Sequence, residues 1–540
     1  MKMKIERAPL VKHVFFLAIM GLLILMGCTK EDNSIDALKT FTLRNPLNYT
    51  NDQNPDYVPL DWSTLPSGYF EMRYSNLTIW ASPYYEVYLW KKVTNDTILH
   101  EKLDVNHFAL IGAEGSTTYQ WKVVAWANER ILIESNIWEF TTEPKMYKGN
   151  ITFSTQSEVD AFAGGDYRII GGDLTILNSD IDPVSNLSPL SEITNIKGDV
   201  IINNTNLTIL AGFTNLEFVA GNLEIKDNEL LTEIQGFKNL ELIGGVFFLS
   251  GNNQLVMLDE FSKLKSVQSD LVITINNSLT SIDNFNQLDS VFGELTIGYN
   301  DLLETINGFH NLSYISGKLG ISGHNRLTSV KGFENVNLIG DQVYHIAKGL
   351  EIRDNGQLSE IPEFNKVNSI GGNFRVDNND HLNVFTGFEN LITINGDFEI
   401  GESNLLTSIP GMNNLEVIGG SFKIDWNWSL ATVAGFENLK TIRGAFIVEN
   451  NAVLKTISGL NRLESIDNNL VFNTNKALTT IDAFDKLQIV GGQISVVFNY
   501  QLNSFCFLKH LVVFGIFQGY VVHYNMVNPT IDEIKELVCD

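Results

Sequence analysis

The chain is poor in basic residues. Of its 540 residues, 37 are lysine or arginine and 63 are aspartate or glutamate, which gives a net charge of −26. Proteins that bind nucleic acid need a basic face to neutralise phosphates, so this composition argues against a nucleic-acid partner. Hydrophobic residues make up 44% and charged residues 19%, as in folded chains. Because 540 residues are too many for one core, we expect several domains or a repeat array.

Long apolar runs are also scarce, and the one at residues 14–26 is informative. Its thirteen residues are fewer than the roughly 20 that span a bilayer, but they follow a basic segment, as in signal peptides. The run ends in Leu25-Met26-Gly27-Cys28, which resembles the lipobox of bacterial lipoproteins. The resemblance implies cleavage before Cys28 and a lipid anchor on its thiol, with the membrane as a partner. The alternative is an ordinary secretory signal followed by an incidental cysteine.

A short acidic segment follows the lipobox. Residues 29–33 read Thr-Lys-Glu-Asp-Asn, which is similar to the surface-export signals of some Gram-negative lipoproteins. This similarity favours the outer membrane with the protein facing the cell exterior, over the periplasmic face. We therefore predict a signal peptide at residues 1–27 and a lipidated tether at residues 28–40.

Residues 41–144 have the alternating pattern of half-buried strands, with turns between them. The approach to a late strand through Tyr119 and Trp121 resembles the tyrosine corner of immunoglobulin-like sandwiches. Together with Trp62 and the closing Trp138-Glu139-Phe140-Thr141-Thr142, the segment resembles a fibronectin type III domain. Such a domain commonly serves as a spacer, and we expect most of its aromatic residues in the core.

From residue 172 onward the chain repeats itself, and this repeat decides the fold. The motif Gly-x-apolar-x-apolar recurs at a spacing of 24 residues, with early steps of 26 and 23 and one step of 31. The first residues of the fourteen units are Gly172, Gly198, Gly221, Gly245, Ser269, Gly293, Gly317, Lys348, Gly372, Gly396, Gly420, Gly444, Asn468 and Gly492. The apolar positions in each unit are two and then three residues apart, which suits short extended segments joined by tight corners and not a helix. We expect an all-β protein: a long parallel β-solenoid of about 14 coils.

Two residue types recur at fixed places in the unit. Phenylalanine recurs in Phe213, Phe237, Phe261, Phe285, Phe309, Phe333, Phe364, Phe388, Phe436 and Phe484. Asparagine recurs in Asn228, Asn252, Asn276, Asn300, Asn355, Asn379, Asn427, Asn451, Asn475 and Asn499. A stacked amide supplies both a donor and an acceptor to a buried corner, so both ladders are expected to be structural.

The unit Asn-Leu-x-x-Ile-x-Gly-x-Leu-x-Ile-x-x-Asn resembles the receptor L domains of insulin and epidermal growth factor receptors, which are akin to leucine-rich repeats. It is visible at residues 414–420 and 438–444. The resemblance implies the fold and says little about the ligand. We assign residues 145–540 to this solenoid, with an N-terminal cap at 149–171 and a C-terminal cap at 502–540.

Both caps are expected to contain a short helix, because an open stack would expose its sheet edges. A capping box starts at Thr155, and a second helix is expected to start near Thr530 and to run through residue 538. Cys539 on that helix could then reach Cys506 in the last coil, which leaves a disulfide or two free thiols as the alternatives.

Motifs that carry chemistry are missing. The nine histidines are scattered, and no HExxH, P-loop, CxxC pair or nucleophile elbow occurs. We therefore predict a non-enzyme without catalytic residues, metal or cofactor. Polysaccharide lyases also use parallel β-helices and are the rival class, but their long loops and Lys/Arg/acid clusters are lacking here.

Two irregularities are candidates for ligand binding. The 31-residue step inserts residues 341–347, which include Tyr344 and His345. Trp426 and Trp428 flank Asn427 at a corner where most coils have small polar residues, and Tyr299 occupies a similar corner. Such aromatics could stack on sugar rings or anchor a protein, or could simply cover a neighbouring corner.

The sequence thus predicts a surface lipoprotein that binds a protein or glycan ligand without catalysis. Adhesion is one version of this function, and carbohydrate capture beside a nutrient-uptake system is the other.

Overall fold

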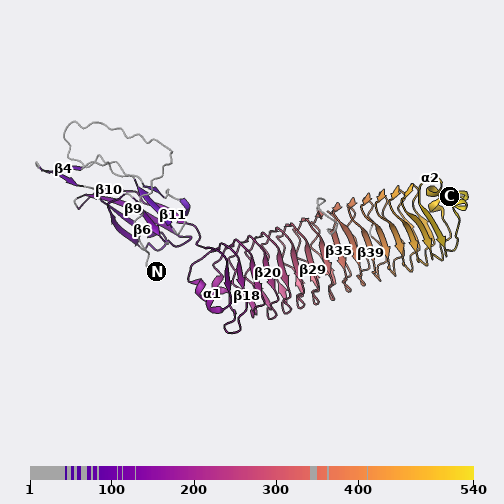
Figure 1. Ribbon diagram of the computed structural model, residues 1–540, viewed down its shortest axis with the longest axis horizontal. Coiled ribbons are helices and arrows are strands. Elements are labelled where there is room, and N and C mark those ends of the chain that lie inside the picture. Colours follow the sequence, from indigo (N-terminus) through magenta and orange to yellow (C-terminus); the bar gives the residue numbers. More distant parts are fainter. Residues whose placement is uncertain are drawn as a thin grey trace, which may run out of the picture. The chain divides into compact units, whose positions relative to one another are not determined.

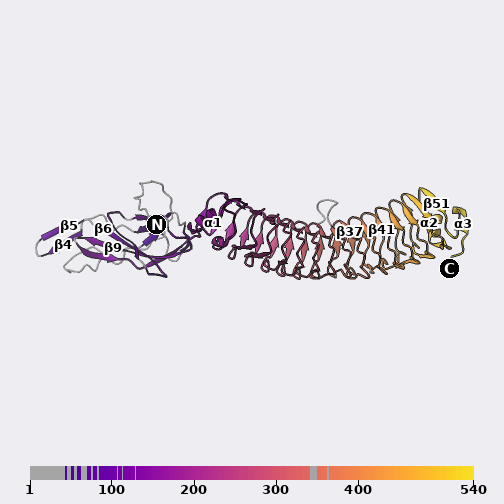
Figure 2. The same ribbon diagram turned by 90° about the horizontal axis from the view of Figure 1, so that it is seen from below.

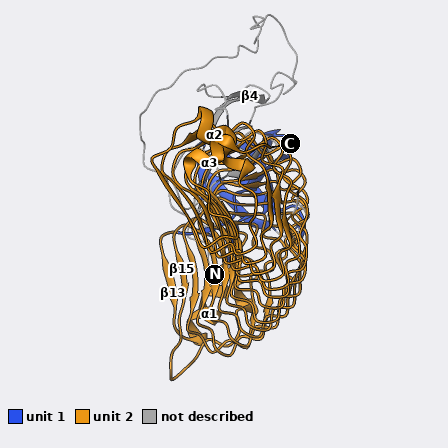
Figure 3. Cartoon of the chain, turned by 90° about the vertical axis from the view of Figure 1, so that its right-hand side faces the viewer, with its two compact units in different colours: residues 1–147, 166–169 blue, residues 148–165, 170–540 orange. Residues whose placement is uncertain are grey.

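The computed structural model describes residues 43–45, 50–53, 57–62, 70–74, 77–81, 84–95, 97–105, 107–111, 113–127, 129–340, 349–361, 364–409 and 411–539. Three predicted features lie outside these residues: the leader with Cys28, the tether, and the insertion with Tyr344 and His345. The chain divides into two units (Figure 3), residues 1–147 with 166–169 and residues 148–165 with 170–540. Each unit is described by itself.

The first unit is a β-sandwich. One sheet has the order β2-β11-β9-β6-β7, with β10 also paired to β9, and the other has the order β1-β3-β8. The strands are β1 (Leu43–Asn45), β2 (Thr50–Gln53), β3 (Tyr57–Trp62), β4 (Phe70–Tyr74), β5 (Leu77–Ala81), β6 (Tyr84–Lys91), β7 (Thr97–Leu103), β8 (His107–Ile111), β9 (Thr118–Ala127), β10 (Arg130–Glu134) and β11 (Trp138–Thr142). The strands β4 and β5 pair with each other as a hairpin.

Aromatic residues fill the core of this sandwich, as expected. Trp62 of β3 lies with its ring centroid 5.6 Å from that of Tyr85 and 6.5 Å from that of Trp121, and all three side chains are buried. The hydroxyl oxygen of Tyr119 accepts a hydrogen bond of 2.8 Å from the backbone N–H of Glu114, five residues upstream. This is the contact that defines a tyrosine corner.

The second unit is a parallel β-solenoid, which confirms the predicted fold class (Figure 1). Its longest sheet has sixteen strands, each paired in parallel with the equivalent strand of the next coil. These strands are β13 (Ile151–Phe153), β15 (Leu174–Ile176), β17 (Val200–Asn203), β20 (Leu223–Lys226), β23 (Phe247–Ser250), β26 (Leu271–Thr274), β29 (Leu295–Gly298), β32 (Leu319–Ser322), β35 (Gly349–Arg353), β37 (Asn373–Asp377), β39 (Phe398–Gly401), β41 (Phe422–Asp425), β44 (Phe446–Glu449), β47 (Leu470–Asn473), β50 (Gln493–Val497) and β51 (Gly519–His523). The stack bends along its length (Figure 2).

Two further faces of the stack also carry strands, the third of them with a gap between β33 and β42. The second sheet includes β16 (Asn195–Ile196), β19 (Phe218–Val219), β22 (Leu242–Ile243), β25 (Ser266–Val267), β28 (Ser290–Val291), β31 (Tyr314–Ile315), β34 (Leu338–Ile339), β36 (Ser369–Ile370), β38 (Thr393–Ile394), β40 (Val417–Ile418), β43 (Thr441–Ile442), β46 (Ser465–Ile466) and β49 (Ile489–Val490). The third face carries β18 (Ile209–Ala211), β21 (Glu233–Gln235), β24 (Met257–Leu258), β27 (Ser281–Ile282), β30 (Thr305–Ile306) and β33 (Ser329–Val330), then β42 (Thr432–Val433), β45 (Thr456–Ser458) and β48 (Thr480–Asp482). Short strands β12 (Met146–Tyr147) and β14 (Ile169–Ile170) lie at the unit boundaries in sequence.

The long sheet extends one strand beyond the predicted coils at each end. The strand β13 follows Gly149 and Asn150 and pairs with β15, and β51 starts at Gly519 and pairs with β50. The strand β13 fits the Gly-x-apolar-x-apolar pattern but leads into α1 instead of a complete unit. At β51 the glycine of the pattern is replaced by Gln518. The segments predicted as caps therefore each contribute a strand to the sheet.

The phenylalanine ladder points into the core, as predicted. From Phe213 to Phe388, consecutive rings lie 5.1–6.1 Å apart between centroids, and every member is fully buried. From Phe374 to Phe446 a second stack, contributed by the long sheet, has centroids 4.7–5.1 Å apart. Stacked rings at this spacing add to the stabilisation from burial.

Both ends carry helices that start with a capping box, of which the one at Thr155 was expected. Thr155 caps α1 (Gln156–Ala163), and Thr530 caps α3 (Ile531–Glu536). The short helices η2 (Ser188–Leu190), η3 (Cys506–Leu508) and α2 (Lys509–Phe514) are further elements of this unit.

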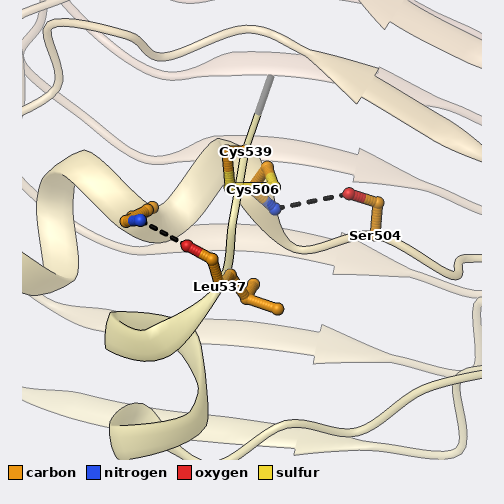
Figure 4. Close-up of a disulfide and its surroundings, with 5 residues drawn as sticks. Ser504, Cys506, Leu537 and Cys539 are labelled. Carbon is orange, nitrogen blue, oxygen red and sulfur yellow. Dashed lines mark hydrogen bonds between the residues drawn. A yellow bond between two sulfur atoms is a disulfide. The ribbon is translucent and has the colours of Figure 1, made fainter.

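The prediction that the last helix runs through residue 538 is wrong. The backbone turns extended at Leu537, whose carbonyl oxygen accepts a hydrogen bond from the Lys509 ammonium (Figure 4). Cys539 therefore lies beyond α3, where it forms a disulfide with Cys506 at a Cα–Cα distance of 5.7 Å.

Removing this disulfide should loosen the C-terminal cap alone. It links residues 33 positions apart, and closing a loop of that length stabilises the folded state by about 3–4 kcal/mol in the chain-entropy description. We expect Cys506→Ser with Cys539→Ser to speed amide hydrogen exchange in α3, with little change near Phe285, because coils contact only their neighbours. Unchanged exchange in α3 would show that the cap is held by its packing alone.

Candidate ligand-binding corner

One corner of every coil is built on a buried polar side chain. The fourteen residues at this position, here called the ladder residues, are Thr205, Asn228, Asn252, Asn276, Asn300, His324, Asn355, Asn379, Ser403, Asn427, Asn451, Asn475, Asn499 and Asn525. All are buried, and most have no solvent exposure at all. Each lies two positions after the last residue of a strand of the long sheet.

The asparagine amides join consecutive coils by hydrogen bonds. The Oδ1 atom of Asn276 accepts from the backbone N–H and from Nδ2 of Asn252, both at 3.1 Å. The Nδ2 group of Asn252 also donates to the carbonyl oxygen of Ile225 at 3.0 Å. The same pattern recurs from Asn427 to Asn525, so the amides satisfy backbone groups that would otherwise be buried without partners.

His324 takes the place of an asparagine in this ladder, a role that the sequence did not reveal. Its Nδ1 atom lies 3.3 Å from the backbone N–H of Asn300, and its Nε2 atom lies 3.2 Å from the carbonyl oxygen of Ile297. An imidazole with its proton on Nε2 therefore accepts and donates where the asparagine amide does. Burial lowers the pKa of His324 from 6.5 to about 4, and its contacts with Asn300 and Ile297 oppose this shift only in part.

The residue before each ladder residue has a left-handed backbone. The fourteen are Asn204, Asp227, Gly251, Ile275, Tyr299, Gly323, Asp354, Asn378, Glu402, Trp426, Asn450, Thr474, Phe498 and Tyr524, with φ between 50° and 74°. Glycine, asparagine and aspartate tolerate this conformation, whereas branched and bulky residues are strained in it. The ladder hydrogen bonds beneath them therefore hold the six branched or bulky members in place: Ile275, Tyr299, Trp426, Thr474, Phe498 and Tyr524.

Trp426 and Trp428 project from this corner into solvent. They flank the buried Asn427, and 46% and 59% of their surfaces are exposed. Among the described residues, neither ring has an aromatic neighbour and neither indole N–H has a hydrogen-bond partner. Both side chains thus offer a flat apolar face and a free donor.

The other corner aromatics are packed against neighbouring coils. The ring of Tyr299 lies over Gly323, where an added Cβ atom would come within 2.6 Å of it. The rings of Phe498 and Tyr524 stack on each other with centroids 4.8 Å apart and an interplanar angle of 4°. Tyr500 completes this group, 6.4 Å from Phe498. These rings cover adjacent corners and still remain exposed by 36–59%.

The outer face of the long sheet carries a ladder of alternating charges. Strand pairing places Glu351, Arg375, Glu399 and Lys423 side by side. Glu399 lies 3.3 Å from Arg375 and 3.0 Å from Lys423. These exposed-to-half-buried pairs contribute little stability each. The apolar residues at the same position are half-buried, and strand pairing places Phe248 beside Val272 and Ile447 beside Val471, whereas Ile201 lies between Thr175 and Glu224.

A hollow of about 630 Å³ lies where the third sheet is interrupted after β33. Its walls include His310, Lys331, Glu334 and Glu360, and its floor includes Phe385. The Nδ1 atom of His310 lies 2.6 Å from Glu334 Oε1. The walls thus combine charged groups with an apolar floor.

Chemistry-bearing clusters are scarce in the part of the chain that the structure describes. No group of three or more His, Cys, Asp or Glu side chains there is arranged to hold a metal ion. Within the same residues, no helix is long and apolar enough to cross a membrane.

Comparison with known proteins identifies part of the solenoid. Residues 168–260 and 289–386 match the family model of the receptor L domain. No curated protein and no solved structure matches the chain. The matched residues include Tyr299 and end before Trp426, so the corner with the two free tryptophans lies outside them.

The buried imidazole should make the solenoid acid-sensitive. Between pH 6.5 and about 4, unfolded His324 binds a proton that the folded state excludes, so stability falls as the pH falls through this window. The shift corresponds to about 3 kcal/mol. The variant His324→Asn restores the usual ladder residue. Between pH 7 and pH 4 we expect its free energy of unfolding, measured by urea denaturation, to fall by about that much less than the wild type's. Parallel losses in both proteins would place the acid sensitivity elsewhere.

Proposed function

We propose that this chain is a non-catalytic binding protein, anchored by a lipid on Cys28 and displayed on the outer face of the outer membrane. The likeness to receptor L domains supports a binding, receptor-like role. The fibronectin type III-like sandwich then serves as a spacer between the tether and the solenoid.

The observation that carries this proposal is the pair Trp426 and Trp428. A fold that needs only small polar residues at its ladder corners has two exposed indoles there, with no partner among the described residues. Large exposed aromatics of this kind are enriched in binding sites, where they supply area at low entropic cost. The ligand is a protein or a glycan, and adhesion or carbohydrate capture are the corresponding functions.

The proposed function is tested first by a binding assay. The full chain, purified in detergent, is applied to a glycan array and to intact cells. We expect saturable binding to one of them, and at least a tenfold weaker binding for the variant that combines Trp426→Ala with Trp428→Ala. Absence of binding to both targets contradicts the proposal.

The same incubations also test catalysis. A binding protein leaves the polysaccharide intact, whereas a lyase or hydrolase releases new chain ends. Accumulation of chain ends, with loss of activity on heating the protein, would overturn the non-catalytic assignment.

The anchor is tested separately at Cys28. In growing bacteria fed a clickable fatty acid, the wild-type chain should become labelled and should be cleaved by protease added outside the cells. Cys28→Ser should remove the label and release the chain from the membrane, while Cys506→Ser should keep the label. Labelling of Cys28→Ser would place the lipid elsewhere.

A further inference from the structure

We infer that the ligand is an uncharged, linear glycan that lies along the solenoid axis on the C-terminal part of the ladder corner. The inference rests on the proposed binding function and names the ligand class and the extent of the site. The site, here called the aromatic ridge, consists of the residues on either side of five consecutive ladder asparagines: Trp426, Trp428, Asn450, Ala452, Thr474, Lys476, Phe498, Tyr500, Tyr524 and Met526.

The ladder sets the distances between the aromatic residues of the ridge. The strands β41, β44, β47, β50 and β51 pair in sequence, and each step advances about 4.8 Å. Trp426 is therefore about 14 Å from Phe498 and about 19 Å from Tyr524 along the axis. Between them lie only the small side chains of Asn450, Ala452 and Thr474 and the flexible Lys476. An extended oligomer can bridge these coils and contact both aromatic groups at once.

The charge of the ridge differs from that of the rest of the corner. Its ten residues include one charged side chain, Lys476, and no acid. The equivalent positions of the nine preceding coils carry six acids: Asp227, Glu229, Asp301, Asp354, Asp380 and Glu402. The whole chain has a net charge of −26, but this strip is nearly neutral. It therefore has no acidic side chains to attract a cationic ligand and only one basic side chain to attract a polyanion.

The shape of the ridge favours a chain-like ligand over a protein. A stable protein interface buries about 800 Å² on each partner, with a broad central patch. The aromatic ridge is two residues wide on a convex corner, with the free faces of Trp426 and Trp428 at one end. Flat aromatic faces with free polar handles suit sugar rings, whose apolar faces stack on aromatics and whose hydroxyls accept from indole N–H groups.

The backbone of the ridge is left-handed, as it is along the whole ladder corner. Trp426, Phe498 and Tyr524 all have φ between 55° and 59°, where asparagine is tolerated far better. Asn378 and Asn450 show that the fold accepts asparagine at this position. The three rings are thus held in a conformation that their own residues disfavour, as is Ile275 outside the ridge, and asparagine at these positions relieves the strain.

These same asparagines supply matched variants for the test. Trp426→Asn, Phe498→Asn and Tyr524→Asn remove rings while easing the left-handed backbone, so the fold is preserved. Trp428→Asn copies Asn404 of the preceding coil. Ile275→Asn makes the same change on the ladder corner outside the ridge and is the control. Thermal denaturation of each variant checks that the solenoid is intact.

The experiment measures the affinity of the full chain in detergent for soluble, uncharged oligosaccharides of increasing length, by calorimetry. We expect affinity to rise until the oligomer spans from Trp426 to Tyr524. Trp426→Asn with Trp428→Asn should weaken binding at least tenfold for every length. Phe498→Asn with Tyr524→Asn should weaken it only for the long oligomers, and Ile275→Asn should leave it unchanged.

The other outcomes separate this inference from the proposed function. Glycan binding that is unaffected by both double variants, or lost on Lys331→Ala in the hollow, overturns the ridge and leaves the binding function standing. Tighter binding of polyanionic polysaccharides, or binding only to a protein on intact cells, overturns the uncharged glycan in the same way. Failure to bind any glycan or cell contradicts both.

Discussion

The buried side-chain amide at one corner of each coil is the interaction on which the solenoid depends. A chain that turns sharply inside a stack leaves backbone N–H and C=O groups without partners, and burying such groups is costly. The ladder amide satisfies the N–H of the preceding coil and a carbonyl oxygen 27 residues upstream. Each coil is therefore joined to the next at this corner, in addition to the pairing of its strands.

The irregular coils show how strict this requirement is. His324 meets it with ring nitrogens in place of an amide. After the longer step, Asn355 still accepts from the N–H of His324 and donates to the carbonyl oxygen of Ile321. The ladder thus continues past the insertion, whose seven residues leave the register of the following coils unchanged.

Residues repeated at a constant interval were predictable because a parallel stack places them directly above one another. The phenylalanine and asparagine ladders and the capping box at Thr155 follow from spacing and residue type alone. The two end strands were missed because β13 leads into a helix and β51 follows one, so neither belongs to a complete repeat. His324, Thr205 and Ser403 were missed as ladder members because residue type identifies the asparagines only. The end of α3 at Glu536 depends on a tertiary contact, the hydrogen bond from Lys509, that no local pattern encodes.

For the candidate site too, the repeat predicts the position of a residue but not its contacts with neighbouring coils. The sequence placed Trp426, Trp428 and Tyr299 at equivalent corners, but only the structure separates them, since Tyr299 packs over Gly323 and the tryptophans have no ring partner among the described residues. The position of Tyr524 at this corner was not predicted, because the last coil departs from the 24-residue spacing. The left-handed backbone could not be read from the sequence either, because most coils use residues that also occur in ordinary turns.

A corner that is fixed from beneath can carry side chains that its own backbone disfavours. In an isolated turn, a tryptophan with positive φ would shift the local conformation, since the cost is on the order of 1–3 kcal/mol. Here the backbone N–H of Asn427 donates to Asn451 Oδ1 and its Nδ2 donates to the carbonyl oxygen of Ile400. These bonds fix the backbone of the corner, whatever side chains flank Asn427. Side-chain identity at the ladder corner is therefore uncoupled from folding, and a fold of identical coils can vary its binding surface without changing its core. At the C-terminal coils the corner carries the aromatic ridge, in place of the acidic residues of the earlier coils.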